Sequence, residues 1–195
     1  ANEMKGWFNT WLVAGVALVW VLATGFAAPQ ASTYQPPAGE TALILQLEGK
    51  GEVVISLNTQ AAPKTTAQII RLAQNGFYNG QKFFRVVKTP RPFLAQFGDP
   101  QTKTKDVADP SIGTGGSGTS VPFEDTGLKN VEGSVGLSLK DNDKSTGDSQ
   151  FYINLANNGF LDGGYAVFGK VVKGMDLVKG LNVGDRVSTA LVKRG

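Results

Sequence analysis

The sequence contains neither histidine nor cysteine, which limits the chemistry that it can perform. Without histidine there is no imidazole base and no serine or cysteine triad that depends on one, and most transition-metal sites are excluded. Without cysteine there is no thiolate nucleophile, disulfide framework or cysteine-based zinc site. Any catalysis must therefore proceed without a side chain that titrates near pH 7.

One concentration of aromatic residues surrounds a single arginine. Arg85 lies within the run FFRVV (83–87), and a second aromatic run follows at Phe151 and Tyr152. Composition alone favours an ordinary apolar core with one surface arginine. The alternative is an apolar pocket beside Arg85, whose guanidinium is charged at every physiological pH.

Two further motifs superficially resemble ligand-binding loops. The run GTGGSG (113–118) is glycine-rich, but it is followed by TSVP (119–122), whereas a phosphate-binding loop needs a Lys-Ser/Thr pair that opens a helix. The run DNDKSTG (141–147) lacks the glycine spacing of a calcium loop and places Tyr152 where a bidentate glutamate is required. We therefore expect a tight surface loop at 113–118, and no metal and no cofactor.

Length and charge limit the organisation of the chain. Its 195 residues allow one medium domain plus an appendage, and 41% hydrophobic residues against 18% charged residues are sufficient for a buried core. The net charge of +3 is too small and too dispersed to indicate a nucleic-acid partner.

The N-terminal region differs in composition from the rest. Residues 7–28 are almost entirely apolar, and as a helix they would reach roughly 33 Å, enough for a bilayer core of about 30 Å. We expect a retained transmembrane anchor at 1–28. A cleaved signal peptide is the main alternative, because Gly25-Phe26-Ala27 resembles a cleavage site, and a buried helix is a third.

The residues that flank the apolar run suggest an orientation and a linker. Lys5 precedes the run, and residues 29–48 contain no lysine or arginine, so the positive-inside rule places the main domain on the extracytoplasmic side (periplasm, cell exterior or lumen). Residues 29–40 contain three prolines and no apolar periodicity, which predicts an extended linker before a domain at 41–195.

The domain has the pattern of short apolar runs that is typical of a compact β-rich protein. Short runs of alternating or continuous apolar residues predict eight strands, at 41–48, 52–57, 82–87, 93–97, 134–139, 150–155, 166–172 and 186–192. Helices are predicted at 62–75, where Pro63 suits the first turn, and at 175–180. This pattern is mainly β and favours a closed antiparallel barrel capped by two helices over a parallel sheet.

Read together, the motifs of the domain resemble the cyclophilin family of peptidyl-prolyl cis/trans isomerases. The resemblance runs from about residue 41 to 192 and rests on seven ordered blocks: FFRVV (83–87), FLAQFGDP (93–100), GTGGSG (113–118), FED (123–125), GSVGLSL (133–139), DSQFYI (148–153) and LDGGYAVFGKVVKGMD (161–176). It implies an eight-stranded antiparallel barrel closed by two helices. It also implies rotation about Xaa-Pro bonds in proline-containing polypeptides.

The resemblance also implies a set of site residues. Arg85 matches the catalytic arginine, and Gln96 matches the side chain that orients it. The walls of the proline pocket match Phe93, Leu94, Phe151, Tyr152 and Leu161. Ser138 and Leu139 match the segment that pairs with the peptide, and Phe160 and Tyr165 match the rim.

The chain departs from the family pattern at several of these positions. Leu94 replaces a usual Met, and Tyr152 replaces a usual Phe, so we expect a hydroxyl at the pocket floor that weakens binding of the proline ring. Phe97 occupies a position normally held by Gly. The segment between Arg85 and Phe93 is about three residues longer than usual, which puts the placement of Arg85 in question.

Two functions follow from these observations. The first is a membrane-tethered isomerase that assists the folding of exported or membrane proteins. The second is a structural subunit of a larger membrane protein complex, with a cyclophilin-like domain that turns over weakly or not at all. The longer segment after Arg85 motivates the second hypothesis.

Overall fold

The structure is a computed structural model that describes residues 31–195. The predicted anchor at 1–28 and the first residues of the predicted linker lie outside the described residues. Within residues 31–195, no helix combines the length and the apolar character needed to cross a membrane.

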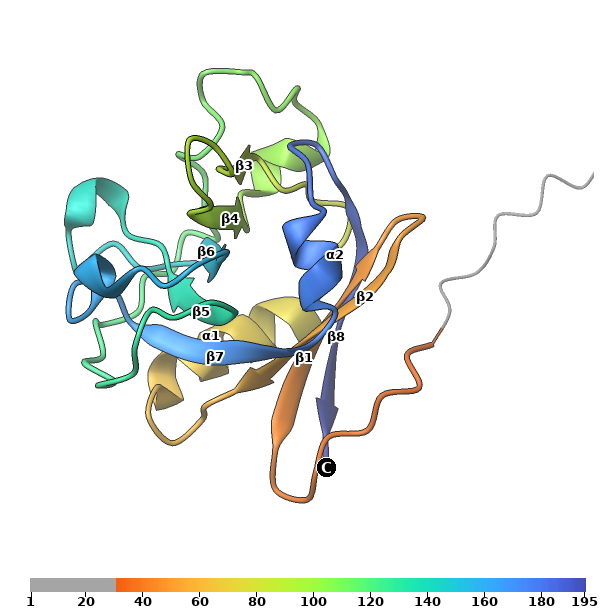
Figure 1. Cartoon of the computed structure of the whole chain (residues 1–195), viewed down its shortest axis with the longest axis vertical. Coiled ribbons are helices and arrows are strands. Elements are labelled where there is room, and N and C mark those ends of the chain that lie inside the picture. Colours follow the sequence, from red (N-terminus) through yellow and green to blue (C-terminus); the bar gives the residue numbers. More distant parts are fainter. Residues whose placement is uncertain (1–30) are drawn as a thin grey trace, which may run out of the picture.

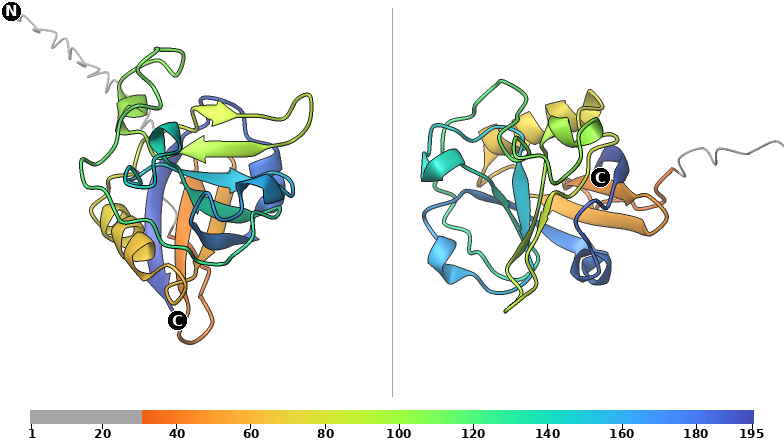
Figure 2. Two further views of the ribbon diagram at one scale, coloured as in Figure 1. Left: turned by 90° about the vertical axis from the view of Figure 1, so that its left-hand side faces the viewer. Right: turned by 90° about the horizontal axis from the view of Figure 1, so that it is seen from above.

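Eight antiparallel strands form one curled sheet (Figure 1). Their order in the sheet is β3-β4-β6-β5-β7-β2-β1-β8. The strands are β1 (Thr41–Leu47), β2 (Gly51–Leu57), β3 (Arg85–Val86), β4 (Leu94–Phe97), β5 (Ser134–Leu137), β6 (Phe151–Asn154), β7 (Val167–Lys173) and β8 (Val187–Arg194). The short strands β3, β4 and β6 lie across from β1, β2 and β8, so the sheet curls back on itself (Figure 2).

The prediction of a closed barrel needs correction, because the two edge strands do not share a ladder. β3 has only two residues, and the edges meet through an isolated bridge between Lys82 and Arg186. The Phe83 N–H donates to the Asp185 carbonyl next to this bridge at 2.9 Å. The sheet is therefore a curled, partly closed barrel, since so short an edge strand cannot support continuous pairing.

Two helices cover the sheet, as predicted. Helix α1 (Pro63–Gln74) has proline in its first turn and packs Ile69 and Leu72 into the core, next to β8. The Glu124 carboxylate, from a distant loop, accepts the Lys64 and Thr65 N–H groups at 2.9 and 2.7 Å, which satisfies free donors at the N-terminus of α1. Helix α2 (Met175–Lys179) lies against β2.

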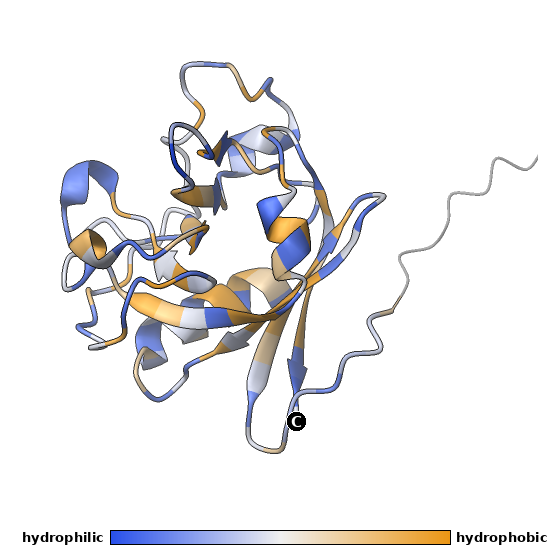
Figure 3. Cartoon of the chain, in the orientation of Figure 1, coloured by the Kyte–Doolittle hydropathy of each residue, from blue (hydrophilic) through white to orange (hydrophobic). Residues whose placement is uncertain are grey.

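Three short 3-10 helices were not predicted from the sequence. They are η1 (Pro100–Lys103), η2 (Lys140–Asn142) and η3 (Gly159–Leu161). η1 lies between β4 and β5, η2 lies between β5 and β6, and η3 lies between β6 and β7. Hydrophobic residues predominate on the strands, and η1 and η2 are hydrophilic, whereas η3 is hydrophobic (Figure 3).

The interior is filled by aromatic and branched side chains. The largest fully buried side chains include Tyr78, Phe83, Phe97, Phe151 and Phe168. Their ring centroids form a chain of contacts at 5.0 to 6.0 Å, within the range of favourable aromatic pairs. The bulky residue at position 97 is thus accommodated in the core.

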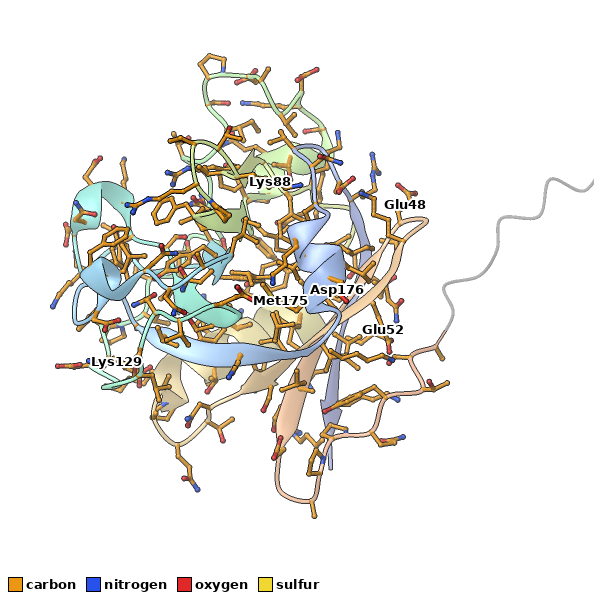
Figure 4. The ribbon with its side chains drawn as sticks, in the orientation of Figure 1. Glu48, Glu52, Lys88, Lys129, Met175 and Asp176 are labelled. Carbon is orange, nitrogen blue, oxygen red and sulfur yellow. The ribbon has the colours of Figure 1, made fainter. Side chains whose placement is uncertain are left out.

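Residues 31–40 contain no helix or strand, but they are docked on the domain and do not form a free spacer. Tyr34 packs on the outer face of the sheet, against Ala42, Ile44 and Val54. The carbonyl of the buried Ser32 accepts from Lys193 Nζ at 2.6 Å. Hydrogen bonds from Lys173 and then from Ser32 hold the pKa of Glu52 below its usual range. Glu52 lies near the β1–β2 hairpin, on the side where this segment enters (Figure 4).

Candidate functional site

One cavity of about 230 Å³ brings together residues from five separate parts of the chain. Strands β3, β4 and β6 supply one side, and the segments after β5 and around η3 supply the other. Its lining residues are Arg85, Phe93, Leu94, Gln96, Ser138, Leu139, Tyr152, Leu161 and Tyr165, all of which the sequence resemblance had selected.

Arg85 lies at the edge of this cavity, with its side chain exposed to solvent. Its Nη1 donates to Gln96 Oε1 at 3.4 Å, and its Cζ lies 5.7 Å from the centroid of the Phe93 ring. Among residues 31–195, no carboxylate forms an ion pair with Arg85. The guanidinium therefore has no counter-ion among these residues and has donors available beside an aromatic wall.

The long segment after Arg85 does not displace it. Arg85 pairs with Gln96, and Val86 pairs with Ala95, in a regular antiparallel register. The hairpin is closed further out by hydrogen bonds at 2.9 Å from the Val87 N–H to the Leu94 carbonyl and from the Phe93 N–H to the Val87 carbonyl. The additional residues form a loop beyond this closure, where Lys88 lies (Figure 4).

A pair of side-chain amides connects Arg85 to the glycine-rich loop. Gln96 Nε2 donates to Gln150 Oε1 at 3.0 Å, and Gln150 Nε2 donates to the carbonyls of Gly113 and Gly115 at 2.9 and 2.7 Å. Gln150 was not among the predicted site residues. Its position directly before the aromatic run of β6 could have suggested a place near the cavity. A sequence does not show, however, that the carbonyls of an irregular loop accept hydrogen bonds from this side chain.

The glycine-rich loop binds a carboxylate of its own chain. Asp99 is fully buried and accepts the N–H groups of Gln101, Gly113 and Gly115 at 2.8, 2.6 and 3.1 Å. At Gly115 there is no room for a Cβ, because it would overlap the Asp99 carboxylate. These backbone donors are therefore already satisfied, and the loop serves as a fixed wall.

The floor of the cavity is formed by Tyr152, whose hydroxyl points away from the opening. The side chain is 3% exposed, and its hydroxyl donates to Asn130 Oδ1 at 2.8 Å. Burial, with smaller contributions from Tyr165 and Asp162, raises the pKa of Tyr152 well above its usual value, so the phenol stays neutral. The expected hydroxyl is therefore bonded within the protein and does not lie free at the floor.

Room for this hydroxyl comes from the neighbouring strand. Gly136 on β5 is the direct cross-strand partner of Tyr152 on β6. A Cβ at position 136 would overlap the Tyr152 hydroxyl and the ring carbon that bears it. Glycine at 136 and tyrosine at 152 thus depend on each other.

Phe151 is the one predicted pocket wall that the structure places elsewhere. It is fully buried in the core, where its ring packs against Tyr78, Phe97 and Phe168. The physical reason is the alternation of a β-strand, in which neighbouring residues point to opposite faces. Tyr152 and Phe151 cannot both face the cavity.

The rim has an aromatic pair and a tyrosine. Phe160 is 67% exposed and stacks on Phe93 at a centroid distance of 5.7 Å. Tyr165 meets the ring of Tyr152 edge-on at 5.8 Å and donates its hydroxyl to Asn142. Phe160 and Tyr165, the two predicted rim residues, thus lie against Phe93 and Tyr152 of the cavity wall.

A second cavity of about 200 Å³ adjoins the first. Gln96, Ser138 and Leu139 line both, and the second is otherwise lined mainly by the glycine-rich loop, Lys140, Asp148 and Gln150. The Ser138 N–H donates to the Gln150 carbonyl at 2.9 Å, which fixes the wall between the cavities. In the part of the chain that the structure describes, no group of three or more acidic side chains is placed to hold a metal ion.

Comparisons with known proteins agree with this architecture. The family model "Cyclophilin type peptidyl-prolyl cis-trans isomerase/CLD" matches residues 42–193. A probable peptidyl-prolyl cis-trans isomerase of Brucella suis biovar 1 is 37% identical over 175 residues, which cover 88% of this chain and 86% of the relative. Peptidyl-prolyl cis-trans isomerase B of Bacillus subtilis is 34% identical over 139 residues, or 71% of this chain and 89% of the relative.

Solved structures show the same fold. A crystal structure of a cyclophilin-type peptidyl-prolyl cis-trans isomerase from Cryptosporidium parvum matches with a TM-score of 0.68 at 21% identity, covering 80% of this chain and 99% of the other. The same protein in the presence of the dipeptide Ala-Pro matches with a TM-score of 0.62 at 22% identity, covering 78% and 96%.

Proposed function

This chain belongs to the cyclophilin-type peptidyl-prolyl cis-trans isomerases, and from that premise we propose how its cleft carries out the isomerisation of Xaa-Pro bonds. The proline ring of a polypeptide enters the 230 Å³ cavity and rests on Tyr152, between Phe93, Leu94 and Leu161. Arg85 donates from the edge of the cavity to the amide that rotates. The observation that carries this proposal is the charged, unneutralised Arg85 beside an aromatic wall.

The chemistry suits a chain without histidine. Rotation about an Xaa-Pro bond must break amide resonance, at a cost of about 18–20 kcal/mol, and without a catalyst takes tens to hundreds of seconds. Twisting localises the lone pair on the proline nitrogen, so a hydrogen bond to that nitrogen is stronger in the transition state than in the ground state. No proton transfer is required.

The magnitude of the effect is plausible for such a site. A 10⁵-fold acceleration needs about 7 kcal/mol, at about 1.4 kcal/mol for each factor of ten. A charge-assisted hydrogen bond in a partly desolvated cleft accounts for about 3–4 kcal/mol of this, by analogy with single oxyanion-hole donors. Orientation of the proline ring in the cavity supplies the remainder.

A proline isomerisation assay on the full chain tests the role of Arg85. We expect Arg85→Ala to lower kcat/KM about 10²- to 10³-fold without unfolding the protein, because Arg85 is exposed and unpaired with acid. Arg91→Ala, at an exposed position on the hairpin loop, is the matched control and should leave the rate unchanged. Equal rates for the wild type and Arg85→Ala would refute the proposed role.

We further propose that this isomerase acts on exported or membrane proteins, tethered by the apolar run at 7–28 with its domain on the extracytoplasmic side. Lys5 before the run and the lack of lysine and arginine at 29–48 support this orientation. The docked segment at 31–40 supports a short connection between the tether and the domain. The alternative role as a weakly active subunit loses its main motive, because Arg85 remains paired with Gln96 despite the longer loop.

The absence of cysteine makes the orientation directly testable. A cysteine at the exposed position Ala108 is expected to react with a membrane-impermeant maleimide in intact cells. A cysteine at Asn2 should react only after permeabilisation. The reverse pattern would contradict the proposed orientation, and recovery of the chain in the soluble fraction would contradict the tether.

A further inference from the structure

The connection that follows β6 contains one buried polar side chain, Asn158, between the exposed residues Asn157 and Gly159. The Asn158 amide bonds to the backbone of a wall of the 230 Å³ cavity. We infer that Asn158 is a positioning residue that sets the width of this cavity, and thereby its preference for the five-membered ring of proline. This inference rests on the binding of the proline ring in the cavity, as proposed above.

The first contact of Asn158 is with the main chain of Phe93. Asn158 Nδ2 donates to the Phe93 carbonyl at 2.9 Å. The same carbonyl accepts the Leu155 N–H at 2.9 Å, which extends the pairing of β4 with β6 by one residue beyond Leu94. Within residues 31–195, no other side chain forms a hydrogen bond with the Phe93 backbone. The Asn158 amide therefore holds this wall at the point where the β4–β6 ladder ends.

The partners of the Asn158 amide fix its orientation. Nδ2 also donates to Asn154 Oδ1 at 2.7 Å, so the amide nitrogen lies between two oxygen acceptors. Asn154 cannot reverse its own amide without losing the bonds from its Nδ2 to Asn130 Oδ1 and Ser134 Oγ, at 3.1 and 2.9 Å. The Asn158 N–H is held as well, since it donates to the Asn130 carbonyl at 2.7 Å. Asn158 is thus a rigid link.

The wall on the other side of the cavity begins at the same residue. Helix η3 follows Asn158 directly, and the Leu161 N–H donates to the Asn158 carbonyl at 2.9 Å. Leu161 lines the cavity, so the backbone of Asn158 holds one wall while its side chain holds the other. Phe160 also joins the two walls by stacking on Phe93. Because Phe160 is largely exposed, this stacking alone is a weak constraint on their separation.

Walls held at a fixed separation select a ligand by the size of its ring. A hydrophobic pocket discriminates against one additional methylene by about 10- to 200-fold. Pipecolic acid is the imino acid with one methylene more than proline, in a six-membered ring. We expect the wild type to isomerise an Ala-Pro peptide with a kcat/KM at least about tenfold higher than that of the matching Ala-pipecolyl peptide. Without the Asn158 amide, the walls can separate, so proline loses contacts and the larger ring fits better.

Magnetisation-exchange NMR on the full chain measures both peptides without a helper protease. In Asn158→Ala, we expect KM for the Ala-Pro peptide to rise about fivefold with kcat within about twofold, because ground-state and transition-state contacts are lost alike. The preference for proline should fall below about threefold. Asn158→Ser leaves space for a water beside Asn154, so it is the second variant if Asn158→Ala does not fold, and its preference should fall in the same direction.

Two controls separate positioning from a general loss of stability. Asn157 is an exposed asparagine of the same connection, and its Oδ1 accepts the Glu132 N–H at 3.0 Å, away from both walls. Asn157→Ala should therefore keep the wild-type preference. Tyr34→Ala removes a side chain that packs on the outer face of the sheet, so it should lower stability and also keep the wild-type preference. If Tyr34→Ala changes the preference as much as Asn158→Ala does, the inference is wrong.

The remaining outcomes separate this inference from the proposed function. Arg85→Ala should lower kcat for both peptides alike and leave the preference unchanged, because Arg85 acts on the amide and not on the ring. Equal rates for Arg85→Ala and the wild type would overturn the role of Arg85 alone. The role of Asn158 is wrong if the wild type does not distinguish the two peptides, or if the folded Asn158 variants retain the wild-type preference.

Discussion

The two halves of the sheet are stabilised in different ways. We call β7, β2, β1 and β8 the long-strand half, since each has seven or eight residues, and β5, β6, β4 and β3 the short-strand half, since each has two to four. In the long-strand half, backbone ladders run the length of the strands, and both faces near β1 are apolar and buried. In the short-strand half, side chains such as Asp99, Asp162 and Gln150 fix the loops.

The site lies in the short-strand half, and this placement has a physical reason. A residue in the middle of a long ladder has both backbone groups paired with its neighbours, so it cannot present them to a substrate or a loop. Short strands leave carbonyls and N–H groups at their ends for other partners, and connections around them carry function on a rigid support. The long-strand half should therefore control stability, and the short-strand half activity.

The largest effect on stability is expected in the long-strand half, at Ile44. Its side chain is fully buried on the outer face of the sheet, beneath Tyr34. We expect Ile44→Ala to lower the free energy of unfolding by about 2–5 kcal/mol, because it removes apolar contacts and leaves a cavity. Denaturant unfolding measures this loss. Activity per folded molecule should stay within about twofold, and a large drop in kcat/KM at full folding would show that the two halves are not separable.

The next effect concerns the short-strand half, at Gly136. A Cβ there overlaps the Tyr152 hydroxyl, so in Gly136→Ala the phenol must leave Asn130 and move into the cavity. We expect a loss of about 1–3 kcal/mol in stability from overpacking, together with weaker peptide binding seen as a raised KM. The double variant Gly136→Ala/Tyr152→Phe should recover only part of the affinity, because it removes the overlap with the hydroxyl but not the overlap with the ring carbon that bears it. Additive losses in the double variant would show that positions 136 and 152 act independently.

The agreement between predicted and observed strands follows the same division. The predicted strands 41–48 and 52–57 agree closely with β1 and β2, because near-continuous apolar runs of this length identify long strands that are largely buried. The strand predicted at 82–87 shrinks to Arg85–Val86, because its flanking residues pair with loops and with Arg186. The pattern of apolar residues alone cannot show where the pairing of a strand ends if the adjacent residues bond to an irregular loop.

For the site, the resemblance located the lining residues but missed what holds them. Arg85 and Gln96 were identified by their motifs, and the structure brings them together. Gln150 was missed, because its partners are backbone carbonyls of a loop that had been assigned only a surface role. The error at Phe151 was avoidable, since the period of two along β6 already excludes two adjacent residues from one face.

A smaller effect is expected at Tyr34, in the segment that was predicted to be a linker. Tyr34 is half-buried and covers the apolar patch of Ala42, Ile44 and Val54. We expect Tyr34→Ala to lower the free energy of unfolding by about 1–2 kcal/mol, less than a fully buried aromatic side chain would cost. Tyr34→Phe, which keeps the ring, is the control and should be close to the wild type. If Tyr34→Ala unfolds at the same denaturant concentration as the wild type, residues 31–40 contribute nothing to the domain.

The smallest effect at neutral pH is expected at Tyr152, a group of the short-strand half whose hydroxyl has a structural role, and it becomes visible at alkaline pH. Burial raises the pKa of Tyr152 above the ordinary value of 10.0, and burial does the same for Tyr78. Above pH 10 the unfolded chain loses these protons while the folded protein retains them, so stability is complete below pH 10 and falls as the pH rises further. Each group contributes at most about 1.4 kcal/mol per pH unit in this range.

Tyr152→Phe removes one of these two titrating groups. It therefore tests whether the Tyr152 hydroxyl contributes to stability without contributing to activity. Its unfolding free energy at pH 7 should fall by only about 0.5–1.5 kcal/mol, since Asn130 Oδ1 still accepts from Asn154 Nδ2 at 3.1 Å. Chemical unfolding between pH 9 and 11.5 should show a shallower decline than in the wild type. Isomerase activity at pH 7 should stay within about twofold, because the hydroxyl faces Asn130 and not the cavity. A much lower activity would mean that the phenol acts on the peptide, and that even the buried floor of the short-strand half takes part in the chemistry.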